Sequence, residues 1–147
     1  MPSAADSAPA VDTRMGGWSG VGYEEIEVGR TWPPRTVVIT PDMLARYFRC
    51  IGRADAPGPR TPVPAFMLNE LRVLKTHMKL PPGVLHAQEE LHLSAPAFAD
   101  EALTIEVSIR DKYLRNGKRF VRVAQQVRRA ADAAPVMTVL HTLYWPC

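Results

Sequence analysis

The spacing of apolar positions changes once along the chain, from a helical period before Gly83 to a period of two after it. The first helical stretch begins at Thr40 and Pro41, which suit an N-cap and a first helical position. The apolar residues that follow are Met43, Leu44, Tyr47, Phe48 and Ile51. Gly52 ends this run, and Arg35–Ile39 before it predicts a short strand.

A second helical stretch begins at Thr61 and Pro62, which repeat the start signal. One face carries Met67, Leu71, Leu74 and Met78. The spacing predicts one long amphipathic helix over about 62–78, roughly 25 Å in length. The run Leu80–Gly83, with two prolines, ends it.

Four strands are predicted after Gly83, near 84–93, 103–109, 121–127 and 136–145. In the first of them, alternation places Leu85, Ala87, Leu91 and Leu93 on one face. His86, Gln88, Glu90 and His92 occupy the other face. The last strand is apolar on both faces, which indicates a covered position inside the sheet.

Asn116 and Gly117 indicate a hairpin between the two middle strands. A two-residue loop would pair Ile109 with Ala124 and put the odd-numbered valines on the wrong face. We therefore predict an odd-length loop or a bulge near Asn116, so that Tyr113 does not pair with Phe120.

A long amphipathic helix among antiparallel strands predicts an α+β hot-dog fold, in which the sheet wraps around the helix. A two-layer α+β sandwich is the alternative. Residues 23–147 are expected to form this single domain. Residues 1–22, rich in Ser, Ala, Pro and Gly, are expected to be a disordered tail, and Met15 is a possible alternative start.

The composition is that of a globular protein, with 46% hydrophobic and 22% charged residues and a net charge of +3. No apolar run reaches the roughly 18 residues that a membrane span needs. The first residues lack the pattern of a signal peptide, and two cysteines make no disulfide framework, so we expect a cytoplasmic protein.

Several segments resemble MaoC-like dehydratases and (R)-specific enoyl hydratases over about 120 residues. The segments are Tyr23–Gly29, Thr40–Tyr47, Pro62–Phe66, Leu85–Glu89, Ser94–Pro96 and Ala99–Leu103. The resemblance implies a dimeric hot-dog protein that hydrates 2-enoyl thioesters or dehydrates 3-hydroxyacyl thioesters of coenzyme A or acyl carrier protein. It implies no further cofactor.

The resemblance also implies a catalytic Asp and His from a Gly-Asp-x-Asn-Pro-x-His segment after the first helix. This chain departs from that motif. If the segment is aligned on Gly52, Arg53 stands where the Asp is expected. If it is aligned on the acid Asp55, Arg60 stands where the His is expected. Asp55 is a candidate general base or a turn residue. Arg53 and Arg60 are candidate ligands for substrate phosphates or carboxylates.

His86 is a second candidate catalytic residue, because relatives with a degenerate motif often carry Leu-His at this strand. A metal site of His86, Glu90 and His92 is rejected, since His86 and His92 lie about 20 Å apart along an extended strand. Glu70 is the candidate base of an alternative thioesterase, with His77 on the same stripe of the helix.

The start of the long helix offers candidate donors to a thioester carbonyl. These are the backbone N–H groups of Val63, Ala65 and Phe66. Basic residues gather between 110 and 129: Arg110, Lys112, Arg115, Lys118, Arg119, Arg122, Arg128 and Arg129. They suit an acidic carrier protein or coenzyme A phosphates, or else protect strand edges from aggregation. No aromatic stacking motif suggests nucleic acid.

Three functions follow from these residues. The chain is a divergent hydratase or dehydratase that uses Asp55 or His86, a non-catalytic subunit that pairs with an active hot-dog dehydratase, or a thioesterase that uses Glu70.

Overall fold

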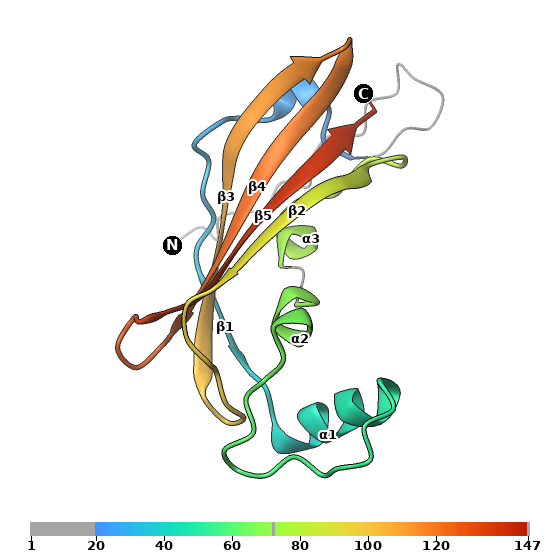
Figure 1. Cartoon of the computed structure of the whole chain (residues 1–147). Coiled ribbons are helices and arrows are strands. Elements are labelled where there is room, and N and C mark those ends of the chain that lie inside the picture. Colours follow the sequence, from blue (N-terminus) through green and yellow to red (C-terminus); the bar gives the residue numbers. More distant parts are fainter. Residues whose placement is uncertain (1–19, 72, 147) are drawn as a thin grey trace, which may run out of the picture.

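Five antiparallel strands form one sheet in the order β1-β3-β4-β5-β2 (Figure 1). The computed structural model describes residues 20–71 and 73–146. The strands are β1 Arg35–Val38, β2 Leu85–Leu93, β3 Ala102–Arg115, β4 Lys118–Arg129 and β5 Pro135–Trp145. The predicted interior position of the last strand is confirmed, because β5 lies between β4 and β2.

The helices of the described chain are short. They are the 3₁₀ helix η2 Tyr23–Glu25, α1 Pro41–Cys50, α2 Ala65–Asn69 and α3 Leu74–His77. Thr40 caps α1 as predicted, because its Oγ1 accepts a hydrogen bond of 3.2 Å from the N–H of Met43. Helices α2 and α3 follow one another along one face of the sheet, whereas α1 lies beyond one end of it (Figure 1).

The prediction of one continuous helix over 62–78 is wrong, because the chain leaves helical hydrogen bonding between α2 and α3. After α2 the Leu71 N–H bonds to Leu68 O, and within α3 the Thr76 N–H bonds to Val73 O, each three residues back. Leu68 and Val73 are both buried. In a regular helix, five positions would place them about 140° apart, and the break lets both face the core.

The prediction about the hairpin loop is also wrong in its position. Asn116 and Gly117 form a two-residue turn with positive φ at both residues, so Arg115 pairs with Lys118 and Tyr113 with Phe120. The required extra residue is Arg110, where a bulge lies between the Ile109–Val123 pair and the next pair. This bulge keeps Ile109 and Val123 on the buried face.

A second bulge, at Ala87, changes the faces of β2. His86 pairs with Leu143 and Gln88 pairs with Thr142, so Ala87 is the unpaired residue. Since pairing alternates faces, His86 lies on the face of Leu143, which α2 and α3 cover, and not on the face of Glu90 and His92. Leu85 consequently points outward and is 61% exposed.

The buried core lies between this covered face and the helices, and the α+β hot-dog architecture is confirmed. Its largest fully buried side chains include Trp145, Phe48, Ile39, Leu44 and Leu68.

The domain begins earlier than predicted. Val21 donates to Lys79 O and accepts from the indole N–H of Trp145. Residues 1–19 of the expected tail lie outside the described part of the chain. No helix in the described ranges is long and apolar enough to cross a membrane.

Candidate functional site

A cleft of about 490 Å³ opens between the covered face of the sheet and the chain from α3 to β2. Its apolar wall is formed by Leu74, Met78, Leu80, Pro81, Val84, Val123 and Leu143. Its polar and charged lining is Asn69, Lys75, Lys79, His86, Glu89, Gln125 and His141. A concavity of this size that combines an apolar wall with polar groups is typical of a ligand site.

Three of these side chains, His86, Glu89 and His141, form what we call the polar cluster. His86 Nε2 lies 3.1 Å from His141 Nδ1. Glu89 Oε2 lies 3.3 Å from His86 Nε2 and 3.4 Å from His141 Nδ1. The side chain of His141 is 18% exposed and that of His86 is 42% exposed, so the cluster runs from the cleft wall to its opening.

The bulge at Ala87 is what assembles this cluster. It turns His86 onto the covered face, where Glu89 pairs with His141 across β2 and β5. Without the extra residue, regular alternation would keep His86 on the face of Glu90 and His92.

Buried amides extend the polar lining on either side. Asn69 Nδ2 donates a 2.6 Å hydrogen bond to Glu89 Oε1, which fixes the carboxylate and leaves Oε2 toward the histidines. Asn69 Oδ1 and Gln125 Nε2 are buried and have no hydrogen-bond partner within the described residues. Both side chains line the cleft, and buried polar atoms without a partner are uncommon in folded proteins.

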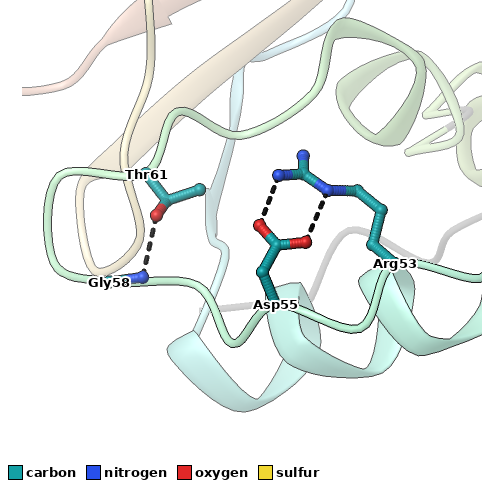
Figure 2. A network of polar contacts seen from close by, with 4 residues as sticks. All are labelled: Arg53, Asp55, Gly58 and Thr61. Atoms are coloured by element: carbon teal, nitrogen blue, oxygen red, sulfur yellow. Dashed lines mark hydrogen bonds and ion pairs between the residues drawn. The ribbon is translucent and has the colours of Figure 1, made fainter.

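Of the two predicted catalytic residues, only His86 reaches the cleft. Asp55 lies in the exposed loop after α1, held by two hydrogen bonds from Arg53 of 3.1 and 2.5 Å (Figure 2). The hydrogen-bonded Arg53 guanidinium lowers the pKa of the Asp55 carboxyl below its usual value. A lowered pKa makes Asp55 a poor general base near neutral pH.

The remaining loop residues also serve local structure. The guanidinium of Arg53 lies 4.2 Å from the ring centre of Phe48 in α1, so Arg53 contacts both Asp55 in the loop and the helix before it. Thr61 Oγ1 accepts from the N–H of Gly58, closing the turn before α2 (Figure 2). Arg60 is exposed.

The predicted thioester donors are only partly available. The N–H of Val63 is not free, because it donates to Ala97 O at 2.7 Å. The N–H groups of Ala65 and Phe66 belong to the first turn of α2, where helices lack internal acceptors. The Phe66 side chain is 71% exposed, and neither residue lines the cleft.

The positions of Glu70 and His77 do not support the thioesterase hypothesis. Glu70 is exposed after α2 and does not line the cleft. His77 stacks on Trp32 with ring centres 5.4 Å apart. Burial, assisted by the charge of Arg35, lowers the pKa of His77. The two residues therefore do not combine with the polar cluster.

The basic residues between 110 and 129 are spread over β3 and β4. Arg128 and Arg129 bind backbone carbonyls of Ala133 and Pro96. Arg115 and Lys118 flank the β3–β4 turn, at the end of the sheet where β2 begins (Figure 1).

Sequence reasoning missed Glu89, Gln125 and His141 as site residues. His141 carried a usable signal, because it is the one Asp, Glu, Lys, Arg or His in the apolar run from Val136 to Trp145. The rejected combination of His86, Glu90 and His92 does not come together, since Glu90 instead binds Arg122 on the other face of the sheet.

No protein-family model and no curated protein matches this sequence. Solved structures do match its fold. The unliganded R-hydratase PhaJ1 from Pseudomonas aeruginosa superposes with a TM-score of 0.69 at 19% identity, covering 86% of each chain. A MaoC-like dehydratase from Rhodospirillum rubrum gives 0.68 at 13% identity, covering 86% of this chain and 97% of that one.

A third match is a complex of two different subunits. The truncated HadBC (3R)-hydroxyacyl-ACP dehydratase from Mycobacterium tuberculosis gives a TM-score of 0.63 at 17% identity, covering 80% of this chain and 96% of that one. The resemblance to MaoC-like dehydratases and (R)-hydratases is thus confirmed in three dimensions, as a shared hot-dog fold.

Proposed function

We propose that this chain hydrates 2-enoyl thioesters or dehydrates 3-hydroxyacyl thioesters in the cleft, with the polar cluster as the proton-transferring group. The observation that carries the proposal is the convergence of His86, Glu89 and His141 on a cleft that also has an apolar wall. The hot-dog fold shared with hydratases and dehydratases supports the reaction class.

The reaction requires one group to move a proton at C2 and another to hold the water or hydroxyl at C3. An imidazole suits either task near neutral pH. The two histidines lie within hydrogen-bonding distance of each other, so a proton can pass between them. Glu89, fixed by Asn69, is positioned to stabilise an imidazolium formed on either ring.

The cleft supplies the other requirements of an acyl thioester. Apolar side chains such as Leu74, Met78 and Val123 provide a wall for the acyl chain. The amide of Gln125 is our candidate donor to the thioester carbonyl, where negative charge develops during the reaction, because Gln125 lines the cleft and its buried Nε2 has no partner among the described residues. This role requires the side chain to turn Nε2 toward the cleft.

The carrier would approach over the β3–β4 hairpin. This hairpin presents basic residues at the end of the sheet where β2 begins (Figure 1), including Arg115, Lys118 and Arg119. Their charge favours the phosphates of coenzyme A or an acidic carrier protein.

The test is hydration of crotonyl-coenzyme A by the purified chain, followed by loss of the enoyl-thioester absorbance. His141→Gln is expected to lower kcat/KM at least about 100-fold, the lower range for loss of a general acid or base. His92→Gln is the matched control, because His92 lies on the opposite face of β2. Equal activity in the two variants would contradict the proposal.

A second function, a subunit that pairs with an active hot-dog partner, is favoured by one observation. The loop after α1 engages its only carboxylate with Arg53 and contains no histidine. The match to the two-subunit HadBC complex is consistent with this arrangement. An inactive purified chain that becomes active with a hot-dog protein from a neighbouring gene, regardless of His141→Gln, would establish this alternative. Release of free thiol lost in Glu70→Gln would instead indicate the thioesterase.

A further inference from the structure

The three facing atoms of the polar cluster are separated by distances that one metal ion would impose. The separations are 3.1, 3.3 and 3.4 Å. Zn²⁺ binds imidazole nitrogen and carboxylate oxygen at about 2.0–2.2 Å, which sets neighbouring ligands about 3.0 Å apart at a right angle and about 3.4 Å apart at the tetrahedral angle. A point about 2.1 Å from all three atoms exists just outside their plane.

We propose that His86, Glu89 and His141 bind one Zn²⁺ ion through Nε2, Oε2 and Nδ1. Two histidines and one carboxylate are a ligand set that zinc and similar divalent transition metals accept, with further coordination positions left open. The open positions face the cleft, which the same three residues line.

Hydrogen bonds among His86, Glu89 and His141 satisfy the three facing atoms less well than a metal ion would. If both ring nitrogens donated to Glu89, two N–H groups would lie side by side with their nitrogens 3.1 Å apart. If only one ring carried its proton on the facing nitrogen, the facing nitrogen of the other ring would present its lone pair to Glu89 Oε2. The two atoms are 3.3 Å apart for His86 and 3.4 Å apart for His141. Either choice opposes like charges, and a cation at the centre removes both conflicts.

The surroundings of the cluster support a metal ion independently of these distances. Asn69 holds Glu89 Oε1 at 2.6 Å, and carboxylate ligands of metals are commonly fixed in this way. Asn69 and Gln125, which are 8% and 2% exposed, both line the cleft, and each has one buried polar atom without a hydrogen-bond partner among the described residues.

This inference does not rest on the proposed reaction. A bound ion occupies the lone pairs of His86 and His141 that proton transfer needs, so Zn²⁺ is expected to inhibit hydratase activity. Binding itself is measured without substrate, and failure of one proposal leaves the other open to its own test.

The test is calorimetric titration of the full-length, chelator-treated and dialysed chain with Zn²⁺, expecting one ion per chain. His141→Gln and His86→Gln should each weaken binding by more than the roughly 10–100-fold that loss of a partner behind a ligand costs. Asn69→Ala, which removes such a partner, should fall within that range. His92→Gln, the matched control, should bind as the unchanged protein does.

Co²⁺ provides a second measurement, because its visible absorption reports nitrogen and oxygen coordination. The exposed thiol of Cys50 is an alternative zinc ligand, so Cys50→Ser must retain binding. His86 is half-exposed on the edge strand, and His86→Gln is the ligand variant least able to disturb folding. Absence of saturable Zn²⁺ binding, or equal affinity in His86→Gln and His92→Gln, would overturn the proposal.

Discussion

His86 Nε2 and His141 Nδ1 lie 3.1 Å apart across β2 and β5, with Glu89 beside both. The pairing depends on the bulge at Ala87, which turns His86 to the face that carries His141. A local irregularity of one residue therefore creates the main polar feature of the cleft.

The hydrogen bond from Asn69 to Glu89 should contribute measurably to stability. Its acceptor is charged and partly buried, so Asn69→Ala is expected to lower the free energy of unfolding by about 1–3 kcal/mol. Urea denaturation of Asn69→Ala, Glu89→Ala and the double variant measures the coupling. Effects that add within about 0.5 kcal/mol would show that the two side chains do not interact.

Asp55→Asn should leave hydratase activity nearly unchanged. Asp55 is exposed, lies outside the cleft lining and is bound to Arg53, so it handles no proton in the proposed reaction. We expect kcat/KM within about threefold of the unchanged protein, against the 10²–10⁴-fold cost of removing a general base. Glu89→Gln, assayed in parallel, should show a much larger loss. The opposite ranking would return the catalytic role to the loop after α1.

Stability should fall on mild acidification because of His77. Its folded pKa is lowered from 6.5 by burial and by Arg35, so the unfolded chain binds the proton more readily. This contribution is fully present above pH 6.5 and is lost as the pH falls through the folded pKa. His77→Phe keeps an aromatic ring against Trp32 and should flatten the pH dependence. Melting temperatures between pH 7.5 and about 5 check this, and parallel profiles for both proteins would contradict it.

Gly117→Ala should destabilise the β3–β4 hairpin through its backbone alone. Gly117 has a φ of +71°, and no atom lies within 4 Å of an added Cβ. We expect a loss of about 1 kcal/mol in the free energy of unfolding, the cost of a left-handed conformation with a Cβ. Gly58→Ala is the control, because Gly58 lacks positive φ and its nearest contact would be 3.8 Å. An equal loss in both variants would contradict the assigned turn.

The local signals of the sequence were sufficient for much of the fold. Thr40 caps α1 as its position before Pro41 indicates. Asn116 and Gly117 mark the hairpin between β3 and β4, as predicted, although we expected an odd-length loop or a bulge there and not the two-residue turn that they form. The apolar run of β5 correctly placed this strand inside the sheet. These outcomes depend on residues that are neighbours in the chain, which is why the sequence alone carried them.

The break between α2 and α3 could not be predicted from spacing. Met67, Leu71 and Leu74 fit one helix face, but the burial of Leu68 and Val73 requires two orientations. The need to fill the core against the sheet outweighed the regular hydrogen bonds of a continuous helix.

The sequence by itself determined the hot-dog class of fold, the absence of an Asp and His pair from the segment 52–60 after the first helix, and the position of His86 in a strand. The edge position of that strand comes from the tertiary structure. Only the tertiary structure decided which partners His86 meets. The bulges at Ala87 and Arg110 are fixed by cross-strand pairing and by burial of the sheet face, and these involve residues distant in the chain. For that physical reason, the polar cluster with Glu89 and His141 emerges only when the strands are paired.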